Sequence, residues 1–220
     1  MSTVASSTST APRSPAGRRP VGRPRHYDDD VERELLLGAA YTSLRDVGPD
    51  FTIANVLEAA GVSTRSFYRH FESKDALLCA MYRRDAQWAA RRLERRLADA
   101  ASPHAALEAW IDEIFSFVRV RKRAERVAVL GSLVANRSAG IDMEAAAGRE
   151  NLVAPLRAAI VAGVADGSFT TTDPAGDADL VAATVMHAAG LVQPARGMAP
   201  HDQAAVLTFC VRALGVRSDR

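Results

Sequence analysis

The chain has 220 residues, of which 48% are hydrophobic, so it can bury the core of one large or two small domains. Its net charge of +2 is too small to indicate nucleic-acid binding by itself, and only the distribution of charge can decide that question. The sequence holds two cysteines and no apolar run near the ~20 residues of a membrane span, which excludes a disulfide scaffold and a transmembrane helix. We therefore expect a cytoplasmic protein without a membrane partner.

Residues 1–27 are rich in Ser, Thr, Ala, Pro and Gly and contain no acidic residue. Such a segment cannot bury enough apolar surface to offset the entropy of ordering it, so we expect a disordered basic arm. Arg23 and Arg25 flank a proline, and an extended arm of this kind can enter the narrow minor groove of A·T-rich DNA. This piece resembles the core of an AT-hook. The alternative is a basic tail that acts only through its charge.

A helix is predicted over residues 30–46, because apolar residues recur there at helical spacing and Gly48-Pro49 ends the pattern. Its expected buried stripe comprises Val31, Leu35, Leu36, Ala39, Ala40 and Leu44.

The stretch from Phe51 to Asp75 predicts two short helices joined by a tight turn. Thr52 is a suitable N-cap for the first helix, and Gly61 can adopt the left-handed backbone that ends it. Ser63 can cap the second helix, whose outer face is expected to carry Thr64, Arg65, Ser66, Tyr68, Arg69 and His70. This arrangement predicts a helix-turn-helix.

The outer face suits DNA for chemical reasons. Arginine can hold guanine through two parallel hydrogen bonds, and hydroxyl groups can bind base edges or phosphate. The alternative is a polar helix face that is merely solvated, and a short motif alone favours that interpretation.

The longer pattern resembles the signature of the TetR family of transcriptional regulators. The resemblance rests on residues 59–63 (AAGVS), 67–71 (FYRHF) and 73–77 (SKDAL). It implies that Thr52 begins the first helix of the motif, that residues 64–70 lie on the recognition helix and that Lys74 touches phosphate. It also implies an all-α fold of about nine helices, with a three-helix DNA-binding domain at residues 28–75 and an effector-binding and dimerisation domain at 76–220.

Further helices are expected at residues 74–99, from Pro103 to the basic Arg121–Arg123 segment, and around 127–134. A longer helix should carry Leu152 to Val164, with Pro155 as a kink or as its true start. The last two helices are expected at residues 177–193 and 201–214.

The last two helices have small and apolar faces that could pack on a twofold copy of themselves, and the resemblance implies a homodimer formed there. The alternative is that these faces are internal core. The resemblance also implies an effector pocket. We name as candidates for an apolar or aromatic ligand Trp110, Ile114, Phe117, Met186 and His187. The alternative is again that they belong to the core.

The sequence therefore predicts a repressor that a small effector releases from palindromic operator DNA. An effector-independent architectural DNA-binding protein that relies on the basic arm is the alternative, and it predicts steep salt dependence. An enzyme is not expected, since the sequence has no nucleophile elbow, phosphate loop or metal-ligand spacing, and Asp112, Glu113 and Glu144 are interpreted as solvated acids. No cofactor and no metal are predicted.

Overall fold

The computed structural model describes residues 28–135, 140–191 and 201–215. Within these ranges the chain forms nine helices and no strand, which confirms the predicted all-α fold. None of the described helices is long and apolar enough to cross a membrane. The helices are α1 (Asp29–Val47), α2 (Ile53–Ala60), α3 (Thr64–His70), α4 (Lys74–Ala98), α5 (Pro103–Arg119), α6 (Arg121–Ala135), α7 (Ile141–Ala165), α8 (Pro174–Ala188) and α9 (Gln203–Ala213).

Four helices start at a capping hydroxyl residue, and two of these caps, Thr52 and Ser63, were predicted from the sequence. The hydroxyl oxygens of Thr52, Ser63, Ser73 and Ser102 accept hydrogen bonds from backbone N–H groups three residues ahead, over 3.0 to 3.3 Å. These bonds satisfy donors that would otherwise be free at the start of each helix. Gly61 ends α2 with φ 66°, the left-handed conformation predicted for it.

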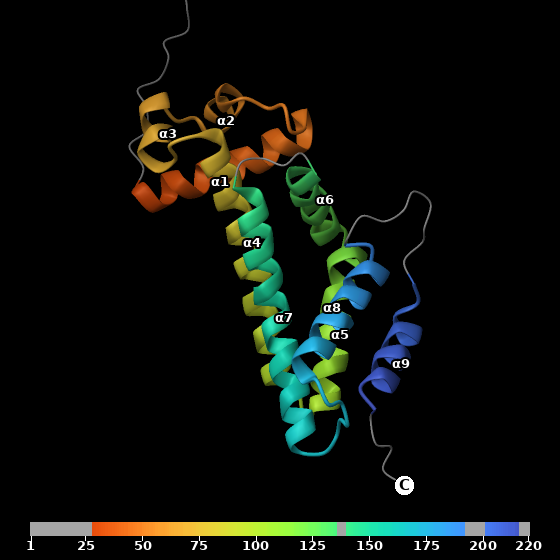
Figure 1. The fold of residues 1–220 in the computed structure, drawn as a ribbon. Helices are drawn as coiled ribbons and strands as arrows, with labels where there is room; N and C mark the ends of the chain where they lie inside the picture. Colours follow the sequence, from red (N-terminus) through yellow and green to blue (C-terminus); the bar gives the residue numbers. More distant parts are fainter. Residues whose placement is uncertain (1–27, 136–139, 192–200, 216–220) are drawn as a thin grey trace, which may run out of the picture.

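Helices α1 to α3 gather at one end of the two long helices α4 and α7, which lie side by side (Figure 1). Leu36, Val56 and Phe67 are fully buried between the three short helices. The same apolar cluster also includes Met81 of α4 and Ile141 of α7, so this core continues past residue 75 into the second half of the chain.

A second core fills the other end of the molecule and joins α4, α5, α7, α8 and α9. Trp110 lies fully buried in it, and its indole N–H donates a 2.8 Å hydrogen bond to the backbone oxygen of Leu152 on α7. Helix α6 lies between the two ends (Figure 1). Val127 packs on the second core, whereas Leu130 and Val134 pack on the first.

The predicted stripe of α1 is wrong at its first residue. Val31 is 47% exposed, and Glu32 is buried in its place. Glu32 lies four residues before Leu36 on the same helix face, and polar partners on α3 make its burial favourable, as described below.

The basic Arg121–Arg123 segment begins α6 and does not end α5, contrary to the prediction. α5 ends at Arg119, and Arg123 forms a 3.1 Å ion pair with the buried Glu113 of α5. The favourable interaction of cations with a helix C-terminus is small, so it does not decide on which helix these residues lie. Pro155 is also not the start of its helix, because α7 begins at Ile141 and runs through it.

Candidate DNA-binding surface

Helices α2 and α3 form the helix-turn-helix that the sequence predicts. The Thr52 hydroxyl accepts from the Asn55 N–H, and the Asn55 side-chain oxygen accepts from the Thr52 N–H over 2.8 Å. This reciprocal cap fixes the start of α2. Phe67 anchors α3 with its fully buried ring, and the turn at Gly61 brings the Ser63 cap into place.

The outer face of α3 exposes three side chains suited to contact DNA: Thr64, Arg65 and Tyr68. Tyr68 is 55% exposed, and its ring meets Phe67 edge to face with 5.3 Å between the centroids. That contact restricts the Tyr68 ring while its hydroxyl group stays on the surface. The face therefore offers two hydroxyl groups and one guanidinium, groups that bind phosphate and base edges.

The opposite side of α3 is held to α1 by an acidic residue that sequence reasoning missed. Glu32 is only 5% exposed and lies 3.1 Å from His70 Nε2. Arg69 donates to the same carboxylate and forms a second ion pair with Asp29 at 3.2 Å. The Ser66 hydroxyl, His70 and Arg69 together hold the pKa of Glu32 below its usual value against the opposing effect of burial.

The placement of Ser66 and His70 on the outer face is therefore wrong. Ser66 is 7% exposed and the His70 side chain is 8% exposed, both facing α1. Arg69 is 44% exposed and is turned toward the two acids of α1. These three residues shape the attachment of α3, and the outer face consists of fewer groups than predicted.

Asp29, Glu32 and His70 are also a group whose geometry could hold a metal ion, since their ligand atoms lie within 4.8 Å of one another. The guanidinium of Arg69 contacts both carboxylates and supplies the positive charge at this place. We therefore assign an ion-pair cluster here and no metal site.

The remaining predicted DNA contacts lie around the motif. Lys74 donates from Nζ to the Pro49 backbone oxygen over 2.7 Å and lies 4.4 Å from the centre of the Phe51 ring. The hydroxyl groups of Thr52 and Ser63 are used as helix caps. Arg23 and Arg25 fall outside the described residues.

The five effector candidates are divided between the second core and the surface. Trp110, Ile114, Phe117 and Met186 are buried members of the second core, whereas His187 is exposed on α8. An open groove of about 880 Å³ lies elsewhere, between the end of α4, the start of α5 and α7, and alanines form much of its wall.

Comparison with known proteins agrees with this geometry. Residues 36–81 match the sequence profile of the bacterial regulatory proteins of the tetR family. No curated protein is significantly similar in sequence. Among solved structures, reduced NemR from E. coli is 20% identical with a TM-score of 0.67, and the match covers 85% of this chain and all of that one.

Two further structures show the same fold at similarly low identity. A TetR-family regulator from Mesorhizobium loti is 17% identical with a TM-score of 0.65, covering 86% of this chain and 97% of its own. The fatty acid degradation regulator FadR from Bacillus halodurans is 14% identical with a TM-score of 0.66, and the match covers 84% of this chain and 97% of FadR.

Proposed function

We propose that this chain, whose residues 36–81 match the profile of the bacterial regulatory proteins of the tetR family, is a cytoplasmic repressor. In this proposal a homodimer binds a palindromic operator, and a small apolar or aromatic effector releases it. The protein acts by binding and not by catalysis. The observation that carries the proposal is the outer face of α3, on which Thr64, Arg65 and Tyr68 are exposed. Contacts with Glu32 of α1 hold the opposite side of this helix.

In the proposed complex α3 enters the major groove. Arg65 is the candidate for a bidentate contact with guanine, and Thr64 and Tyr68 are candidates for phosphate or base contacts. Lys74, at the start of α4, is a candidate for the neighbouring phosphate. Ser66 and His70 take no part, because their side chains face α1.

The proposed dimer forms through α8 and α9. Leu180 on α8 is 67% exposed and Phe209 on α9 is 51% exposed, unusual positions for large apolar side chains. The neighbouring exposed positions carry small residues such as Ala183 and Ala205, which allow helices to approach closely. A twofold axis at this surface would present two α3 helices to grooves about one DNA turn apart, ~34 Å.

Sequence-specific binding by the purified protein tests the DNA part. DNA selected from a random pool should contain a palindrome, and Arg65→Ala should weaken binding to it by about 1–3 kcal/mol and relax the preference at one position of each half-site. Arg91→Ala, an exposed arginine on α4, is the matched control. Unchanged specific binding by a variant with Arg65→Ala and Tyr68→Ala would refute the assignment of α3.

The dimer is tested by light scattering on Leu180→Arg combined with Phe209→Arg, which should be monomeric. Met143→Arg, at a position that is 79% exposed on α7, is the control and should stay dimeric. A doubly substituted protein that keeps the wild-type mass would exclude this surface.

A further inference from the structure

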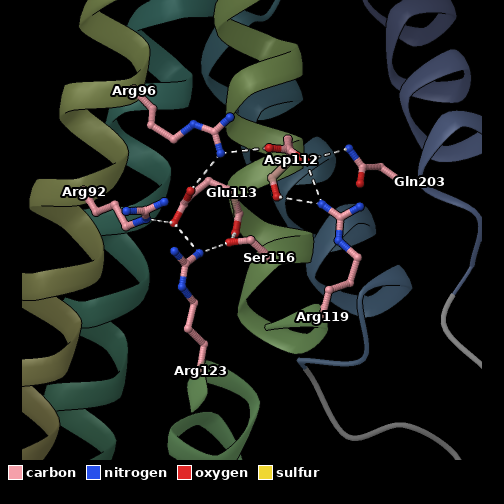
Figure 2. A network of polar contacts seen from close by, with 8 residues as sticks. All are labelled: Arg92, Arg96, Asp112, Glu113, Ser116, Arg119, Arg123 and Gln203. Carbon is pink, nitrogen blue, oxygen red and sulfur yellow. Dashed lines mark hydrogen bonds and ion pairs between the residues drawn. The ribbon is translucent and has the colours of Figure 1, made fainter. Parts of the chain in front are cut away.

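Glu113 on α5 is a fully buried carboxylate held by three arginines, although the sequence suggested a solvated acid. Arg92 Nε lies 2.6 Å away, Arg96 Nη1 2.9 Å and Arg123 Nη1 3.1 Å. The three guanidinium groups come from α4 and α6 and converge on it (Figure 2). Burying a carboxylate is costly without a partner, but one or two guanidinium groups suffice to balance a single charge.

The neighbouring Asp112 adds no balancing charge, because it brings its own arginine. It pairs with Arg119 at 2.7 Å and shares Arg96 at 2.8 Å, and Gln203 of α9 donates to it over 3.4 Å. Four guanidinium groups therefore face two carboxylates in this network (Figure 2). Two positive charges remain unbalanced within it.

The surplus charge is accessible from solvent beside an aromatic ring. The side chains of Arg92, Arg96 and Arg119 are 34%, 36% and 52% exposed. Trp88 lies one helical turn before Arg92 on the same face of α4 and is 40% exposed. The Arg123 guanidinium lies 5.8 Å from the centre of its ring.

We propose that this network binds an organic anion, namely a carboxylate attached to an aromatic ring. A guanidinium has five N–H donors in a planar fork, and the contacts to Glu113 and Asp112 use only some of them. The fork matches a carboxylate in two parallel hydrogen bonds, and partial burial strengthens that contact over its value in water. The Trp88 ring offers the apolar surface against which the aromatic part of the ligand packs.

The site touches α6, one of the helices that pack on both cores. Arg123 is in the first turn of α6, and Leu130 and Val134 of the same helix pack on the core of the DNA-binding domain. A ligand that competes for Arg123 would change the contacts that hold α6 in place. The assignment of this anion as the effector rests on the proposed function, whereas its binding does not.

Calorimetric titration of the full chain with benzoate tests the site directly. Benzoate should bind saturably, and benzamide, its neutral counterpart of the same shape, should not. Arg92→Gln and Trp88→Leu should each weaken benzoate binding by about tenfold, since these two side chains are one helical turn apart on α4. Asp112→Asn should strengthen it, because it removes a competing carboxylate from a position that is 38% exposed.

Arg121→Gln is the matched control, since this arginine is on the same helix as Arg123, is 85% exposed and pairs with Glu125. It removes the same charge from the protein and should leave benzoate binding unchanged. Absence of benzoate binding, equal binding of benzamide, or an equal loss in Arg121→Gln would each overturn the proposed site.

Operator binding with and without benzoate then tests the effector role. Benzoate should weaken operator binding by the wild type and not by Trp88→Leu. Benzoate binding without any change in operator affinity would overturn the effector role and leave the proposed DNA binding intact. Loss of all specific DNA binding would defeat the proposed function, and the calorimetric result would still stand.

Discussion

Replacing Glu32 with alanine tests how far DNA binding depends on the attachment of α3 to α1. Glu32 contributes to that attachment and does not lie on the outer face of α3. α3 has seven residues, too few to be stable without tertiary contacts. Alanine removes the partner of the nearly buried His70 and one of the two acids that hold Arg69. A lost charge-assisted hydrogen bond to a buried group costs about 1.5–3 kcal/mol, and the contact with the half-exposed Arg69 adds at most about 1 kcal/mol.

We therefore expect Glu32→Ala to lower the free energy of unfolding by about 1.5–4 kcal/mol in urea at neutral pH. It should also weaken operator binding, although Glu32 does not reach the DNA-facing surface. Glu34→Ala is the matched control, an exposed acid on the same helix that pairs with Arg84, and it should change stability by less than about 0.5 kcal/mol. Equal effects of the two substitutions would refute the role assigned to Glu32.

The effect of Glu32 should also depend on pH. Its pKa in the folded chain lies below the ordinary value of 4.5, because the Ser66 hydroxyl, His70 and Arg69 favour the ionised form. The ionised Glu32 therefore contributes its full stabilisation to the fold above pH 4.5. This contribution is lost as the pH falls through the lower pKa that Glu32 has in the folded state. The difference in stability between wild type and Glu32→Ala should shrink at acid pH, and a difference that stays constant down to pH 3 would contradict this reasoning.

Four further substitutions test other parts of the structure. Burial raises the pKa of Asp85 from 3.8 to about 6, against the effect of Arg126, so its contribution to stability falls as the pH rises through that interval. Melting temperatures should show this fall in the wild type and not in Asp85→Asn. Ser63→Ala removes the α3 cap and should cost about 1 kcal/mol in urea unfolding. Gly163→Ala should destabilise by about 1–3 kcal/mol, because its methyl group would meet the buried Phe169 ring. Gly38→Ala, with open space around it, should instead stabilise slightly.

The local signals of the sequence predicted the helices well because they act over a few residues. A capping hydroxyl and its N–H partner are three positions apart, so Thr52, Ser63 and Ser73 could be recognised without knowledge of the fold. The start of α6 could not be predicted in this way. Arg121 has no local capping signal before it, and the partner of Arg123, Glu113, lies ten residues away on a different helix.

The misplacement of Ser66 and His70 had a different cause. Ser66 and His70 are four residues apart, and His70 lies three residues after the buried Phe67, so helical spacing places both on the inward side of α3. Their polar character suggested the outer face, although their spacing indicated the inner one. Glu32 shows the same pattern on α1, where it lies on one helix face with the buried Leu36 and Ala40, at intervals of four residues. A polar residue on an apolar stripe is thus a signal of a buried polar partner on the facing helix.

The position of α6 illustrates how such buried partners connect the two cores. Arg123 and Arg126 are three residues apart and therefore on one face of α6, and they pair with two buried acids, Glu113 of α5 and Asp85 of α4. Asp85 also accepts a hydrogen bond from Tyr41 of α1. Apolar side chains tolerate small slides, whereas an ion pair at about 3 Å loses its hydrogen bond when the groups separate by an ångström or so. A shift of α6 that frees Arg123 would therefore strain the contact at Asp85 as well, and Asp85 lies directly against the first helix of the DNA-binding domain.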